Sequence, residues 1–126
     1  MKKLLILATI LLTFEYANAQ YELDLSNKTF QQVDKIPEST TELYFASKTQ
    51  VIYIITNTIK GKTYIDKCPG KATLQGYKVS IICECDDKEI YPDPILDSFN
   101  YDPKSKTLVS TRYRSTDGRF HLWNLK

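Results

Sequence analysis

The sequence predicts an all-β protein, a small antiparallel meander closed into a barrel or half-barrel of about seven or eight strands, with one short N-terminal helix. Three observations predict it. Residues 77–85 alternate apolar and polar side chains, runs rich in β-branched and aromatic residues follow one another from Thr41, and the connections between the last runs have hairpin length. A two-sheet β-sandwich is the alternative architecture for the same strands.

The clearest strand is the stretch Tyr77 to Cys85. Its odd positions carry Tyr, Val, Ile, Cys and Cys, and its even positions are mostly polar. Because side chains of a strand alternate between its two faces, we expect the odd positions to face a core.

The first 19 residues have the composition of a signal peptide. Lys2 and Lys3 precede an apolar run, and Ala17-Asn18-Ala19 has the small-x-small form of a cleavage site. The apolar run is shorter than the ~20 residues that span a bilayer, so we expect no membrane span. The sequence therefore predicts a signal peptide at 1–19 and one β domain at 20–126, secreted or periplasmic.

The mature chain is nearly neutral, with 15 basic and 14 acidic residues. No global charge attracts it to a polyanion, and we expect no nucleic-acid partner.

The N-terminal part of the mature domain predicts two short elements. Tyr21 to Leu25 alternates well enough for a strand. Ser26 or Asn27 then has the character of an N-cap for a helix that runs through Ile36 and stops at Pro37.

The remainder predicts strands joined by turns. The turn signals are Lys60-Gly61, Pro69-Gly70, Gln75-Gly76 and the hairpin linkers at 102–106 and 115–118. We expect strands at 41–45, 51–58, 62–67, 77–85, 95–101, 107–114 and 119–125. Tyr77, Val79, Ile81, Phe99 and Val109 are expected to fill the interior.

The three cysteines allow a geometric prediction. If Gln75-Gly76 is a two-residue turn, Cys68 faces Cys83, and the sequence predicts a Cys68–Cys83 disulfide in an oxidising compartment. Cys85 lies two residues further on the same face, so Cys68–Cys85 is the alternative pairing. An absence of any bridge within the chain is the third possibility, since three cysteines leave one unpaired.

The residue inventory favours a protein without a catalytic set. His121 is the single histidine, which excludes sites that need two. Cys68, Cys83, Cys85 and His121 have the right count for zinc but not its compact spacing, and the acidic stretch 84–102 lacks the glycine of a calcium loop. We expect no metal, no cofactor and no enzymatic activity, with the acidic stretch forming a solvated loop.

The C-terminal part is basic and suggests a partner surface. Residues 104–126 carry six basic residues against one acidic residue. Arg112 and Arg114 share one face of their predicted strand, and aromatic residues are frequent in interfaces. The predicted partner-binding residues are Arg112, Tyr113, Arg114, Arg119 and Trp123.

These observations predict a secreted or periplasmic, non-catalytic binding module, most simply a protein-binding inhibitor or an immunity-type protein. Ser110-Thr111-Arg112-Tyr113 followed by Trp123 is similar to the ends of periplasmic lysozyme inhibitors of the C-type family, but the Ser-Gly-x-x-Tyr loop of that family is missing. No family assignment is drawn from it. The alternative function is a lipocalin-like carrier of a small apolar ligand.

Overall fold

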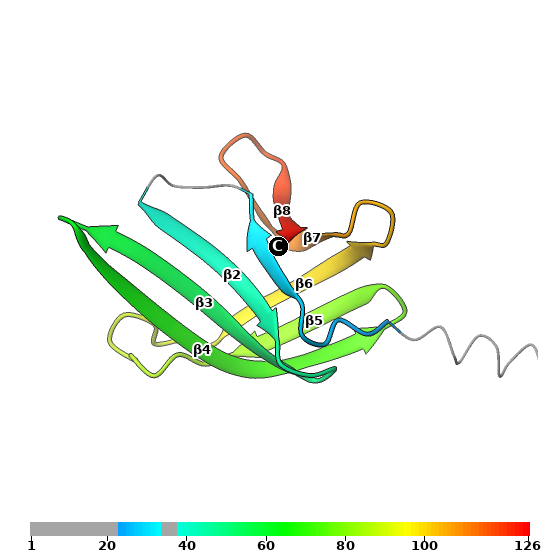
Figure 1. Cartoon of the computed structure of the whole chain (residues 1–126), viewed down its shortest axis with the longest axis horizontal. Coiled ribbons are helices and arrows are strands. Elements are labelled where there is room, and N and C mark those ends of the chain that lie inside the picture. Colours follow the sequence, from blue (N-terminus) through cyan, green and yellow to red (C-terminus); the bar gives the residue numbers. More distant parts are fainter. Residues whose placement is uncertain (1–22, 34–37) are drawn as a thin grey trace, which may run out of the picture.

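Eight antiparallel strands close into one barrel in the computed structural model, which describes residues 23–33 and 38–126 (Figure 1). Each strand pairs with the next, and the last pairs with the first. This confirms the predicted all-β meander barrel and excludes the two-sheet alternative. The strands are β1 (Thr29–Gln32), β2 (Ser39–Phe45), β3 (Gln50–Ile59), β4 (Lys62–Gln75), β5 (Lys78–Cys83), β6 (Ile95–Asp102), β7 (Thr107–Arg114) and β8 (Phe120–Leu125).

Strand β1 is the short seam that closes the barrel. Phe30 lies opposite Leu43 of β2 on one side and opposite Leu125 of β8 on the other. Near the seam, the Lys126 Nζ lies 3.0 Å from a carboxylate oxygen of Glu42. The two ends of the described chain therefore meet in the same part of the sheet.

The predicted helix beginning at Ser26 or Asn27 is wrong over the described residues, which contain no helix. Asn27 adopts a φ of 64° in a turn, and its N–H donates to the Phe45 carbonyl at 2.7 Å. The chain then extends as β1, because there Phe30 is fully buried and both strand edges find partners. The end of that helix falls on residues 34–37, outside the described residues.

The strand predicted at Tyr21 to Leu25 does not form in its described part. Residues 23–25 have no regular structure, although Leu25 is fully buried against the core. Residues 21–22 and the predicted signal peptide lie outside the described residues. The part of the chain that the structure describes has no apolar helix long enough to cross a membrane.

Two of the turns show why the sequence fixes some registers and not others. Lys60 and Gly61 form the predicted two-residue turn, with φ values of 52° and 77° that match the type I′ geometry of tight hairpins. The next hairpin is shifted from its prediction, because Gly76, with a φ of 61°, takes the first central position and Tyr77 the second. Gln75 therefore pairs with Lys78.

The interior of the barrel is filled by side chains. Val79, Ile81 and Cys83 point inward as predicted, but Tyr77 lies in the turn and is 55% exposed. Rings meet edge to face along the interior. The pairs are Phe30 with Phe45, Phe30 with Tyr101, Phe99 with Trp123 and Tyr53 with Trp123, with centroids 5.8 to 6.2 Å apart. Such contacts are typical of the core of a small barrel.

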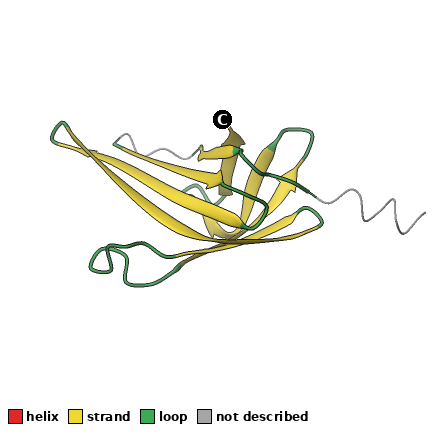
Figure 2. Cartoon of the chain, turned by 60° about the horizontal axis from the view of Figure 1, so that its bottom comes forward, coloured by secondary structure: helices red, strands yellow, loops and turns green. Residues whose placement is uncertain are grey.

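The β3–β4 hairpin is longer than the strands around it and projects beyond the barrel wall (Figures 1 and 2). Strand β4 pairs with β3 along its length from Lys62 to Lys71, but its register with β5 covers only Gly70 to Gln75. The first half of β4 therefore has a neighbouring strand on one side.

Candidate functional site

The C-terminal hairpin brings four of the five predicted partner-binding residues to one end of the barrel. Arg112, Tyr113 and Arg114 end strand β7, and Arg119 lies just before β8. All four are exposed. Trp123 is 1% exposed and packs inside the barrel, so this residue is not part of the surface that the sequence suggested.

An irregularity in the β7–β8 register shapes this surface. The register shifts between Val109 and Arg114, and the Ser110 hydroxyl oxygen accepts the backbone N–H groups of Arg112 and Tyr113 at 3.2 and 3.0 Å. Ser110 is buried, whereas Val109, which the alternation placed inside, is only half-buried. A strand bulge re-aims side chains, and here it coincides with the exposed Arg112 and Tyr113.

A buried carboxylate holds this bulge from inside. The Ser110 hydroxyl donates to Asp97 Oδ1 at 2.8 Å, and the Ser98 N–H donates to the same oxygen at 2.8 Å. Asp97 is 6% exposed. Burial raises the pKa of Asp97, while the Ser110 and Ser98 hydrogen bonds and the nearby charges of His121 and Arg112 oppose that rise. Asp97 thus links β6 to the backbone that carries the arginines.

Two arginines of this hairpin lie over aromatic rings. The Arg114 guanidinium carbon lies 4.3 Å from the Phe120 ring centroid, and that of Arg112 lies 5.5 Å from Tyr113. Arg119 lies 3.8 Å from Asp117. Within the described residues, neither Arg112 nor Arg114 has a carboxylate at ion-pair distance.

Phe120 is a member of this surface that the sequence did not suggest. It is 37% exposed and lies directly opposite Arg114 in the hairpin. The available signal was its place after the Asp117-Gly118 turn, which sets it across from the end of β7. We call Arg112, Tyr113, Arg114, Arg119 and Phe120 the arginine–aromatic surface.

The disulfide joins Cys68 and Cys85, with Cα atoms 4.1 Å apart, and not Cys68 and Cys83. The prediction was wrong because the turn at Gly76-Tyr77 shifts β5 by two residues, so that Gly70 lies opposite Cys83. The alternative pairing is the one that forms. Cys83 is a buried free thiol whose pKa is raised by burial from 9.0 to about 11.

The polar groups near the surface are occupied by structural contacts. The Ser110 hydroxyl donates to Asp97 and accepts from two amides, which differs from the serine–histidine contact of an activated nucleophile. Gln32 Nε2 lies 2.9 Å from His121 Nδ1. Among the described residues no three His, Cys, Asp or Glu side chains gather as a metal site.

The acidic segment between β5 and β6 folds around one of its own carboxylates. Asp87 Oδ1 accepts the backbone N–H groups of Glu89 and Ile90 at 3.1 and 3.2 Å.

Comparison with known proteins gives no assignment, because no family model, curated protein or solved structure matches this chain.

Proposed function

We propose that this protein is a non-catalytic binding module of an extracytoplasmic compartment, and that it captures another protein through the arginine–aromatic surface. The observation that supports this most is the pair Arg112 and Arg114. Both are exposed, both lie over rings, and neither has a carboxylate at ion-pair distance in the described part of the chain. Arginine and tyrosine are enriched among the residues that dominate binding energies.

The chemistry of this surface points to an acidic partner. Three guanidinium groups lie on one hairpin, and a guanidinium binds a carboxylate with two parallel hydrogen bonds. The Asp97–Ser110 contact fixes the backbone beneath them, which lowers the entropy lost on binding. An inhibitor or an immunity-type protein that covers an acidic site of its target fits this surface.

The disulfide is compatible with such a compartment, since disulfides persist where the environment is oxidising. The carrier function has less support. The ring contacts of Phe30, Phe99 and Trp123 occupy the interior where an apolar ligand of a lipocalin-like barrel would lie.

The proposal is tested by affinity capture from the medium or periplasm of the producing cells. The baits are the wild-type protein, the Arg112→Glu/Arg114→Glu variant, and a control, Lys78→Glu/Lys104→Glu. The control makes the same change of net charge at exposed positions near the β6–β7 loop at the other end of the barrel.

We expect a partner that the wild type and the control retain and that the arginine variant loses. Its association rate is also expected to fall with added salt, because opposite charges steer the encounter. A partner retained equally by all three baits contradicts the proposed surface, and the absence of any captured protein contradicts the proposed function.

A further inference from the structure

The first half of β4 has a free edge. Its pairing with β3 runs from the Ile59–Lys62 pair to the Gln50–Lys71 pair, but on the other side its pairing with β5 begins only at Gly70, opposite Cys83. The Glu84 N–H donates to the Pro69 carbonyl at 3.0 Å. Within the described residues, this is the last backbone hydrogen bond on that side of β4 toward the tip of the β3–β4 hairpin. Beyond it, no strand pairs with β4 on this side up to the hairpin tip (Figure 2), and the Tyr91 hydroxyl donates to Asp66 Oδ2 at 3.5 Å.

The direction of the backbone N–H and C=O groups on this edge follows from their alternation along a strand, in which successive residues point to opposite sides. The Thr58 N–H donates to the Glu38 carbonyl, just before β2, at 2.8 Å. The backbone of the preceding residue, Asn57, therefore turns toward β4 and its partner Tyr64. Tyr64 and Asp66 are therefore bonded to β3. Thr63, Ile65 and Lys67 direct their N–H and C=O groups to the free edge, where no described residue accepts or donates.

The sequence of this edge complements itself. If a second copy lies antiparallel with Tyr64 opposite Tyr64, then Lys62 falls opposite Asp66 and Thr63 opposite Ile65, on both sides of the axis. Tyr64 and Ile65 are 51% and 57% exposed, and Lys62 and Thr63 are also exposed. Aromatic pairs and opposite charges facing each other across strands are the pairs that stabilise a sheet.

The backbone and the side chains agree on this register. Thr63 and Ile65, the residues with free backbone groups, become the hydrogen-bonded pairs. Lys62–Asp66 and Tyr64–Tyr64 become the non-hydrogen-bonded pairs, in which side chains lie closest together. One alignment thus satisfies the edge amides and places each charge beside its opposite.

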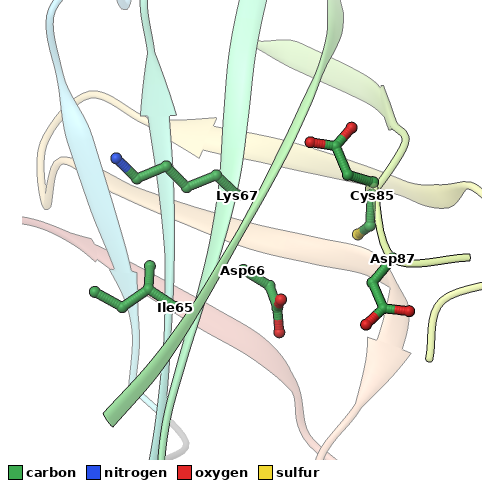
Figure 3. Close-up of a pocket in the computed structure, with 6 residues that line it drawn as sticks. Ile65, Asp66, Lys67, Cys85 and Asp87 are labelled. Atoms are coloured by element: carbon green, nitrogen blue, oxygen red, sulfur yellow. The ribbon is translucent and has the colours of Figure 1, made fainter. Parts of the chain in front are cut away.

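The space beyond the edge fits the same arrangement. In this register the Lys60-Gly61 turn of one copy reaches the level of Lys67 in the other. An open notch of about 390 Å³ lies there, lined by Ile65, Asp66, Lys67, Cys85, Asp86 and Asp87. Figure 3 shows Ile65, Asp66 and Lys67 on the strand and Cys85 and Asp87 on the facing segment. Three carboxylates against one lysine suit the entry of the basic Lys60 turn.

We propose that two copies of this chain associate through the free edge of β4, with residues 62–66 paired antiparallel about a two-fold axis at Tyr64. The other side of the hairpin is already covered, because β2 pairs with β3 along Ser39 to Phe45. The same edge of both copies is used about one two-fold axis, so the pairing closes at two copies instead of growing into a filament.

The side-chain register is tested by charge exchange, with the dimer dissociation constant measured by analytical ultracentrifugation. Lys62→Asp and Asp66→Lys each place like charges opposite one another, and each is expected to raise the dissociation constant at least about tenfold. The double variant restores two opposite-charge pairs in the same register. Its dissociation constant is expected to return to within about threefold of wild type.

The backbone is tested separately at Ile65. Proline there removes an N–H that points to the free edge while Tyr64 and Asp66 keep their bonds to β3, and edge strands tolerate proline at such positions. Ile65→Pro is expected to be monomeric and Ile65→Val to remain a dimer. If the proline variant fails to fold, the charge-exchange variants alone test the proposed pairing.

Three outcomes overturn the proposal. If the wild type stays monomeric up to millimolar concentration, the edge does not pair with a second copy, and an extended segment of a different protein becomes the alternative occupant. If the dimer still forms with Ile65→Pro, or if its dissociation constant does not change in the charge-exchange variants, the two copies associate through another part of the surface. Assemblies that keep growing with concentration contradict the two-fold closure.

Discussion

At the scale of single residues, substitutions are expected to affect stability most where neighbouring backbone leaves no room for a side chain or where a polar group is buried. Gly70 is one of them. A Cβ built on it would lie 2.0 Å from the Ile82 carbonyl oxygen and 2.6 Å from the Cys83 Cα. Both neighbours are backbone, so neither can rotate away. The sequence predicted a turn at Pro69-Gly70, but β4 continues through both residues, and no local pattern signals this close approach.

We expect Gly70→Ala to destabilise the fold by about 3 kcal/mol or more, because β4 and β5 must separate. Gly76→Ala is the matched comparison. It has a φ of 61° and nothing within 4 Å of an added Cβ, so only the left-handed conformation is penalised, by about 1–2 kcal/mol. Urea denaturation measures both, and an equal loss in the two variants would contradict the packing at Gly70.

Asp97 gives the protein a pH dependence of known sign. Its pKa is raised above the ordinary 3.8 by burial, so the folded state binds its proton more tightly than the unfolded state does. Stability from this group is complete below the unfolded pKa and is lost as pH rises through the folded pKa. We expect Asp97→Asn to gain in stability relative to wild type on going from pH 3.8 to neutral pH. Denaturation curves across that range test it, and parallel wild-type and variant profiles would contradict it.

At the scale of elements, period-two alternation predicts most strands because each of them buries one face. Val79, Ile81 and Cys83 lie inside as the alternation requires, and the Lys60-Gly61 turn fixes the β3–β4 register. The helix predicted from Ser26 or Asn27 failed over its described part, up to Val33, for the opposite reason. The spacing of Phe30, Val33 and Ile36 suits a helix locally, but Phe30 gains more by pairing with β2 and β8 than a short isolated helix can offer.

The β4–β5 register was missed because Gln75-Gly76 and Gly76-Tyr77 are both acceptable two-residue turns, differing only in where glycine sits. The shifted β4–β5 register also decides which cysteines form the disulfide.

The candidate surface was predicted from charge and composition, and Arg112, Tyr113, Arg114 and Arg119 are exposed there. The bulge at Ser110 and the burial of Trp123 depend on contacts with β6 and the core, which local sequence does not encode.

The Cys68–Cys85 bridge ties β4 to the acidic segment across a sequence separation of 17. We expect Cys68→Ala/Cys85→Ala to lose about 3 kcal/mol, since the unfolded chain regains the freedom of that loop. Cys83→Ala is the control, because it removes a sulfur without opening a loop. Thermal unfolding of both variants measures the difference, and a bridge variant no less stable than the control would show that the bridge does not stabilise the fold.

At the scale of the whole molecule, hairpin connections predict the order of the strands but not the closure. Closure depends on β1 and β8, which are the first and last strands of the described chain and have no local signal in common. The seam is also narrow. β1 makes three register pairs with each neighbour, whereas β3 and β4 make ten.

We therefore expect the barrel to open first at β1. Its amides should exchange with solvent deuterium at least about tenfold faster than those of β5, because local opening of the seam breaks few contacts. Hydrogen exchange followed by NMR makes the comparison residue by residue. Equal rates in both strands would mean that the seam opens only when the entire barrel unfolds.

The indole of Trp123 is 1% exposed, lies against Phe99 and Tyr53, and its Nε1 has no hydrogen-bond acceptor among the described residues. It is also the chain's one tryptophan. The protein therefore has a single intrinsic fluorophore, and it is buried in the core of the barrel. Its emission should be blue-shifted in the native state and move to longer wavelength when solvent enters, so light alone can follow folding and unfolding without any attached dye.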